Sequence, residues 1–243
     1  MVYDVAVEFH SINWDVDPAT LTLKDLQLLG TRVLKLQDAL CAKARNGNLE
    51  ERTDEDLVLG ILDEIGELRE ALKHKDAINI AEEKTDIFFR VIRLLSTKNV
   101  PLVRLCKEML FPRHVEGSPA LGTLQEFEYA LGKQSGEESI NTKGFLAAYQ
   151  ILLDVYNAMG EEMCDKHQRH GPTGEKVESA VRKFVRWYLV DLWFMMRTDL
   201  SLVTVTRIFL AKQRMIAEGD LAGKKRDKDK ERDVIRRVLD DAR

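Results

Sequence analysis

The sequence predicts an all-α protein. Apolar residues recur at helical spacing along most of the 243 residues, whereas alternating β-branched runs bounded by turn residues are almost absent after the first ten residues. Hydrophobic residues make up 44% of the chain, which is enough to fill a sizeable core. We therefore expect a soluble helical bundle.

Long helical patterns in the first half of the chain occupy residues 23–46, 54–73 and 77–98. Thr22 and Asp25 at the start of the first pattern resemble a capping box with a shorter acid. Asp76 is the expected N-cap of the third pattern. Because only a few residues around Lys75 separate the second and third patterns, we expect an antiparallel helical hairpin.

The chain divides into four predicted regions: residues 1–111 hold the core helices, 112–141 form an irregular connection, 142–223 carry further helices of the same fold, and 224–243 are a charged tail. A short helix is expected between Pro101 and Leu110, and longer ones at 142–167, 176–196 and 200–218. The tail mixes both signs of charge and is typical of a solvated helix or flexible end. The alternative is a basic segment that closes over a phosphate-bearing ligand.

Charge and cysteine content exclude several classes of protein. Charged residues are 32% of the chain but nearly cancel to a net charge of -4, which disfavours nucleic acid as a partner. The N-terminal segment MVYDVAVEFHSINWDVD does not resemble a signal peptide, and no apolar run is long enough to span a membrane. We therefore expect a cytoplasmic protein, in which Cys41, Cys106 and Cys164 are buried free thiols.

Two pairs of acidic residues carry the strongest functional signal. Glu64 and Glu67 are three residues apart in DEIGELREAL, and Glu83 and Asp86 have the same spacing in EEKTDIFFRVIRLL, so each pair shares a helix face. Both pairs are symmetric about Lys75, and a hairpin that turns there places them at matching heights. Each acid also borders the apolar stripe of its helix.

Four facing carboxylates repel one another unless they are protonated or neutralised by a cation. Oxygen ligands without His or Cys favour Mg²⁺, with Mn²⁺ as the alternative, over zinc. The simpler interpretation is a solvated acidic face, whose acids would pair with basic residues of the same helices: Arg69, Lys73, Lys84 and Arg90.

The two acidic motifs resemble the signature of the all-α nucleoside triphosphate pyrophosphatases, which include MazG proteins and the dimeric dUTPases. The resemblance covers residues 54–95 and implies a MazG-like helical core, a nucleoside triphosphate substrate, and a homodimer or higher homo-oligomer. It implies cleavage between the α and β phosphates, which releases a nucleoside monophosphate and pyrophosphate. The implied metal ligands are Glu64, Glu67, Glu83 and Asp86, and Glu67 together with Glu64 would be catalytic, with Glu67 orienting or deprotonating the attacking water.

The C-terminal half carries a weaker resemblance to dimeric dUTPases and related dCTP/dUTP hydrolases. WFMMRTDLSLVTVTRIFLAKQ is similar to a helix pair that ends near a Lys-Asn in those enzymes, and Lys212-Gln213 falls at that place. Gln37 is similar to a base-reading residue of the first helix, but Cys41 stands where the dimeric dUTPases have Asn. The base therefore stays open. Candidate phosphate contacts are Lys212, Arg214, Lys224 and Lys225.

Three other interpretations compete with this one. The spacing Cys164-x-x-His167-x-x-His170 is that of a zinc-site fragment, but it lacks a fourth ligand at a recognised spacing. A non-catalytic helical interaction protein would keep the acids without using them. A different phosphoanhydride, such as a phosphoribosyl-ATP intermediate, is a further candidate substrate because related helical folds accept such compounds.

Overall fold

The computed structural model describes residues 4–44, 54–110, 122–128 and 200–242. The described elements, in chain order, are α1 (Val5–Ser11), a 3-10 turn η1 (Pro18–Thr20), α2 (Leu23–Ala44), α3 (Asp54–His74), α4 (Ala77–Thr97), α5 (Leu102–Leu110), α9 (Leu202–Leu221) and α10 (Lys228–Asp241). In these residues the one β feature is an isolated bridge between Thr22 and Thr123. The all-α class is therefore confirmed, and the alternating start of the chain forms helix α1.

The predicted hairpin is present, and Lys75 lies at its turn. Lys75 adopts a left-handed φ of 53°, the conformation that commonly ends a helix. The amide of Asp76 donates to the carbonyl of Ala71 at 3.0 Å, and the amide of Lys75 donates to Leu72 at 3.2 Å. The Asp76 side chain then accepts from the amide of Ile78, so one residue ends the turn and begins α4. These local bonds set α3 and α4 side by side.

The start of α2 confirms the predicted cap and adds a long-range tie. Thr22 and Asp25 exchange hydrogen bonds of 3.2 Å and 3.1 Å, as in a capping box. The side-chain nitrogen of Gln27 donates to the Val100 carbonyl at 3.0 Å, and its side-chain oxygen accepts from the backbone amide of Leu102 at 2.8 Å. Gln27 therefore holds the start of α5 against α2.

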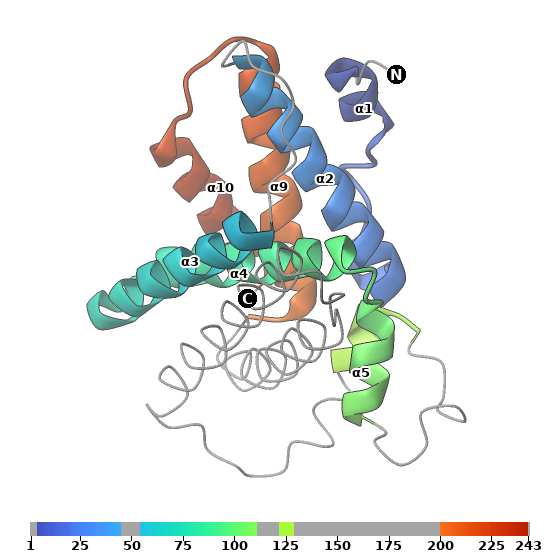
Figure 1. Cartoon of the computed structure of the whole chain (residues 1–243). Coiled ribbons are helices and arrows are strands. Elements are labelled where there is room, and N and C mark those ends of the chain that lie inside the picture. The colour runs from blue at the N-terminus through green and yellow to red at the C-terminus, as the bar shows by residue number, and fades with distance from the viewer. Residues whose placement is uncertain (1–3, 45–53, 111–121, 129–199, 243) are drawn as a thin grey trace, which may run out of the picture.

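Helix α4 lies at the centre of the described core, where it contacts α2, α3, α9 and α10. Its apolar residues Ile87, Phe88 and Ile92 are fully buried. Gly30 of α2 permits a close approach here, because a Cβ at that position would lie 2.8 Å from the Phe89 ring. Figure 1 shows α2 and α9 side by side, crossing the α3–α4 hairpin.

The C-terminal tail is not a free end. Its helix α10 packs on α9 and α4, and Ile235 is completely buried in the core. Arg232 of α10 donates to the second oxygen of Asp76 at 2.8 Å, which ties the tail to the hairpin turn. The predicted region boundaries remain a prediction, since much of 112–199 lies outside the described residues. The same is true of the predicted helices at 142–167 and 176–196 and of the group Cys164, His167 and His170.

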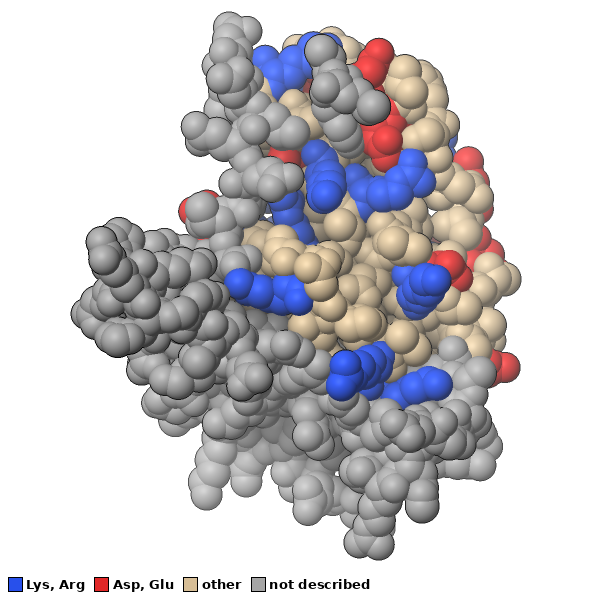
Figure 2. Space-filling view, turned by 45° about the vertical axis from the view of Figure 1, so that its right-hand side comes forward, with Lys and Arg blue, Asp and Glu red and all other residues tan. Residues whose placement is uncertain are grey.

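The face in Figure 2 carries Lys and Arg side chains in several small groups, which other residues separate from one another. Among the described helices, none combines the length and the apolar character that crossing a membrane requires.

Replacing Asp76 tests the turn. Asp76→Ala removes the cap of α4 and the bond from Arg232, and we expect it to lower the free energy of unfolding by about 1–2 kcal/mol. The matched variant Asp76→Asn keeps a cap acceptor and should lose less stability.

Burial opposes ionisation of Asp76, but bonds from the Asn79 amide and Arg232 lower its pKa below the ordinary 3.8. The stabilisation is then present above pH 3.8 and is lost as the pH falls through the lower folded pKa, so both penalties should fade in acid. Chemical denaturation across this range measures them, and a penalty unchanged in acid would contradict the assignment.

Candidate functional site

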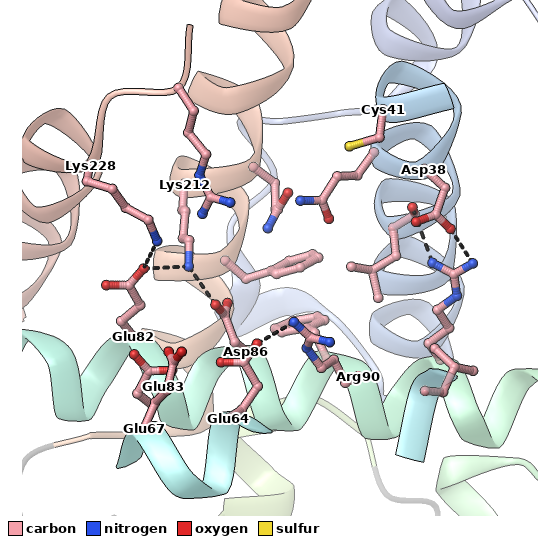
Figure 3. Close-up of a pocket in the computed structure, with 18 residues that line it drawn as sticks. Asp38, Cys41, Glu64, Glu67, Glu82, Glu83, Asp86, Arg90, Lys212 and Lys228 are labelled. Carbon is pink, nitrogen blue, oxygen red and sulfur yellow. Dashed lines mark hydrogen bonds and ion pairs between the residues drawn. The ribbon is translucent and has the colours of Figure 1, made fainter. Parts of the chain in front are cut away.

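A cavity of about 370 Å³ lies between the hairpin, α2, α9 and the segment that begins α10. Five acids of the hairpin line one side, and α2 contributes Asp38 and Cys41 on the side opposite Lys228 (Figure 3). The lining residues are Leu34, Gln37, Asp38, Cys41, Leu57, Glu64, Glu67, Glu82, Glu83, Asp86, Phe89, Arg90, Arg93, Phe209, Lys212, Gln213, Arg226 and Lys228.

The hairpin brings three of the four predicted metal ligands together. Carboxylate oxygens of Glu64, Glu83 and Asp86 lie within 4.8 Å of one another, and Glu64 and Glu83 are buried. Glu67 lines the same cavity but is exposed and lies outside this group. We call Glu64, Glu83 and Asp86 the carboxylate cluster; the ligand roles themselves stay a prediction.

The carboxylate cluster shares a proton in the absence of a cation. Burial, followed by a hydrogen bond that the Glu83 carboxyl donates to Glu64 and by the charges of the other acids, raises the pKa of Glu83 to about 9. Burial also raises the pKa of Glu64. The second oxygen of Glu83 is buried without a hydrogen-bond partner. Three carboxylates, one of which has a buried oxygen without a partner, fit a hard divalent cation, which would replace the proton.

Two basic side chains oppose the charge of the cluster from opposite sides. Arg90 pairs with Glu64 across the hairpin. Gly60 leaves room for that guanidinium, because a Cβ there would lie 2.0 Å from Arg90 Nη1. From α9, Lys212 Nζ donates to Asp86 at 2.6 Å and to Glu82 at 2.8 Å (Figure 3).

These ion pairs set the charge states of Lys212 and Glu82. Burial works against the Lys212 ammonium, but Asp86 and Glu82 outweigh it and raise the pKa of Lys212. Burial likewise opposes ionisation of Glu82, but Lys212 outweighs it and lowers the pKa of that carboxyl. Lys212 is therefore a charged partner of the acids.

The charged tail supplies two cations to the cavity. Arg226 donates to both oxygens of the completely buried Glu231, at 2.5 Å and 2.7 Å. Lys228 is mostly exposed and lies 3.8 Å from both Glu82 and Glu231. A basic segment therefore borders the acidic site, and its closure over a phosphate-bearing ligand stays a prediction.

Aromatic and amide side chains occupy the part of the cavity between α2 and α9. The rings of Phe89 and Phe209 stack with centroids 3.5 Å apart and an interplanar angle of 7°. Gln213 is buried and its side-chain oxygen has no hydrogen-bond partner, whereas Asp38 pairs with Arg93. Gln37 of α2 also lines the cavity. This region offers apolar contact and amide hydrogen bonds.

The predicted substrate contacts divide into two groups. Gln37 and Lys212 line the cavity, although the Lys212 ammonium is already held by two carboxylates. Arg214 faces another groove and pairs with Asp15 and Glu218, so the structure does not bring it to the site.

Lys224 and Lys225 border a separate hollow at the α9–α10 connection and are not among the lining residues. Sequence reasoning missed Glu82, Arg226 and Lys228. It treated Arg90 only as a partner of solvated acids. Cys106 is buried as expected, and burial raises its pKa, whereas Cys41 is only partly buried because it lines the cavity. Neither forms a disulfide, and Cys164 lies outside the described residues.

An all-α hairpin with clustered carboxylates, beside one buried and one exposed cation, is an arrangement that suits hydrolysis of phosphoanhydrides. Comparison with protein families agrees: residues 38–110 match the family described as PRA-PH, phosphoribosyl-ATP pyrophosphohydrolase. This is a MazG-like family of all-α, metal-dependent pyrophosphohydrolases, and the match includes both acidic motifs. It supports the superfamily but not the narrower resemblance to dimeric dUTPases. No match was found among curated proteins or among solved structures.

Glu83→Gln tests the proton that the cluster shares. Above the ordinary pKa of 4.5 the folded protein holds a proton that the unfolded chain releases, so the metal-free protein should lose stability as the pH rises toward 9. The neutral amide avoids this cost. We expect the variant to match the unmodified protein near pH 5 and to melt at a higher temperature near pH 9, both in chelator. Equal pH dependence in the two proteins would contradict the shared proton.

Proposed function

We propose that this protein is a magnesium-dependent pyrophosphohydrolase that cleaves a nucleoside triphosphate into a monophosphate and pyrophosphate. The observation that carries the proposal is the carboxylate cluster, whose oxygens lie within 4.8 Å at the wall of a cavity that Arg226 and Lys228 also line. The family match at residues 38–110 supports pyrophosphohydrolysis over the alternative of a non-catalytic interaction protein.

Glu64, Glu83 and Asp86 would hold Mg²⁺, with Mn²⁺ as a substitute. A bound ion would offset charge on the phosphate oxygens and favour ionisation of a nearby water. Glu67 has the properties of a general base, because it lines the cavity, is exposed, and lies outside the cluster. We propose that it orients the attacking water and accepts its proton.

Arg226 and Lys228 would bind the departing pyrophosphate, whose negative charge needs cationic hydrogen-bond donors. We propose that the base lies near Phe89 and Phe209, with the amides of Gln37 and Gln213 as its hydrogen-bond partners. An amide group offers both a donor and an acceptor, so the described residues fit more than one base. A deoxynucleotide such as dUTP or dCTP remains our first candidate, in a homo-oligomeric, cytoplasmic enzyme.

Phosphoribosyl-ATP is the second candidate substrate, and the family match is the observation that favours it. It carries the same type of phosphoanhydride, so the carboxylate cluster suits both substrates equally. The two substrates differ at the base, where phosphoribosyl-ATP carries an additional phosphate. Arg93, which lines the cavity and pairs with Asp38, is a candidate partner for that phosphate.

A substrate panel tests the reaction. Pyrophosphate release from the common ribo- and deoxynucleoside triphosphates and from phosphoribosyl-ATP, each with Mg²⁺ or Mn²⁺, should identify one preferred substrate. Glu67→Gln should lower kcat by roughly 10²–10³-fold through loss of the base. Glu70→Gln is the matched control, since Glu70 is exposed on the same helix and pairs with Lys73. The enzyme proposal fails if no compound yields pyrophosphate with either metal.

A separate measurement tests the tail. Lys228→Ala should raise KM for the preferred substrate about tenfold and change kcat little, because one phosphate contact is lost. Lys230→Ala is the control: Lys230 pairs with Asp227 and is not a lining residue of the site. Equal KM values for the two variants would remove the tail from the binding site.

A further inference from the structure

The ammonium of Lys212 occupies an unusual position for a lysine. The side chain is 1% exposed, and its nitrogen lies 2.6 Å from Asp86 and 2.8 Å from Glu82. Figure 3 shows it reaching from α9 to the two acids of α4. Burying a lysine without partners is costly, so the two carboxylates are a condition of its position.

Asp86 is shared between two adjacent acidic positions. On one side it completes the carboxylate cluster with Glu64 and Glu83. On the other side it faces Glu82, one helical turn away, across the Lys212 ammonium. The first position contains the unsatisfied oxygen of Glu83, whereas in the second position both acids already have a cation.

We propose that Lys212 serves as a built-in second cation, so that the nucleotide-free chain binds one divalent ion in the carboxylate cluster and none between Glu82 and Asp86. This inference rests on the proposed metal site and adds the number of ions to it. Lys212 is then a positioning residue that fixes Asp86 for the single ion.

Charge and distance both support this assignment. Magnesium binds carboxylate oxygens at about 2.0–2.1 Å, so a metal between Glu82 and Asp86 would need nearly the space that the ammonium now fills. A second divalent ion would also meet the fixed charge of Lys212 and, at 3.8 Å from Glu82, that of Lys228. Removing the ammonium would leave two carboxylates facing one centre, a ready site for a metal.

A purely structural role makes a different prediction. If Lys212 only tied α9 to α4, its loss would lower stability and leave the number of ions unchanged. If it stands in for a cation, its loss should create a second ion site that depends on Glu82.

Counting Mn²⁺ separates these roles. Nucleotide-free protein is titrated with Mn²⁺ by calorimetry and by electron paramagnetic resonance. Glu83→Gln removes a ligand of the cluster, so any ions that this variant still binds lie outside the cluster. We expect one cluster ion in the unmodified protein and in Glu82→Gln. Lys212→Gln and Lys212→Met should bind two ions with a spin-coupled signal, and Lys212→Gln combined with Glu82→Gln should return to one.

Each outcome decides the inference. It is overturned if the Lys212 variants fold and still bind one ion, or if the unmodified protein already shows a spin-coupled pair. The second measurement needs no substitution, so a spin-coupled pair in the unmodified protein overturns the inference even where both Lys212 variants fail to fold. No cluster ion in the unmodified protein would instead remove the metal site of the proposed function, and this inference with it.

Discussion

Repulsion among the hairpin carboxylates is the constraint that the rest of the structure meets. Helices α3 and α4 place oxygens of Glu64, Glu83 and Asp86 within 4.8 Å, a separation that buried anions tolerate only with compensation. The described residues supply it from three sources: a shared proton, Arg90 on Glu64, and Lys212 on Asp86. Packing of α9 against α4 therefore combines apolar burial with charge matching.

The hairpin was predictable from the sequence because its signals are local. Asp76 caps α4 and Lys75 turns the chain, as the symmetric spacing of the acids indicates. The same spacing overstated the equivalence of Glu64 and Glu67. Residues three apart differ by about 60° around a helix axis, so Glu64 points into the core while Glu67 lies on its rim. Symmetric spacing along the chain predicts the position of each acid along its helix axis but not how deeply the acid is buried.

The basic side of the site depends on contacts that no local pattern contains. Lys212 lies more than a hundred residues after Asp86, and spacing does not tell which helix α9 meets. A signal existed nevertheless: Lys212 falls on the apolar stripe with Val205, Ile208 and Ile216. A charge on such a stripe indicates a buried partner. Arg214, two residues later, points about 200° away around the helix axis, is exposed, and pairs with other acids. Position on the apolar stripe therefore distinguishes Lys212 from Arg214.

The cations around the cavity differ in how firmly they are held, and this difference separates their roles. Lys212 is fully buried between two acids, so its departure would take the close ion pair from both carboxylates at once. Lys228 is 67% exposed, and its nitrogen comes no closer than 3.8 Å to its nearest acids, so water weakens this pairing. A polyanion entering the cavity would therefore recruit Lys228 at little cost and leave Lys212 in place. The fixed cation serves the carboxylates, and the loose one is available to the substrate.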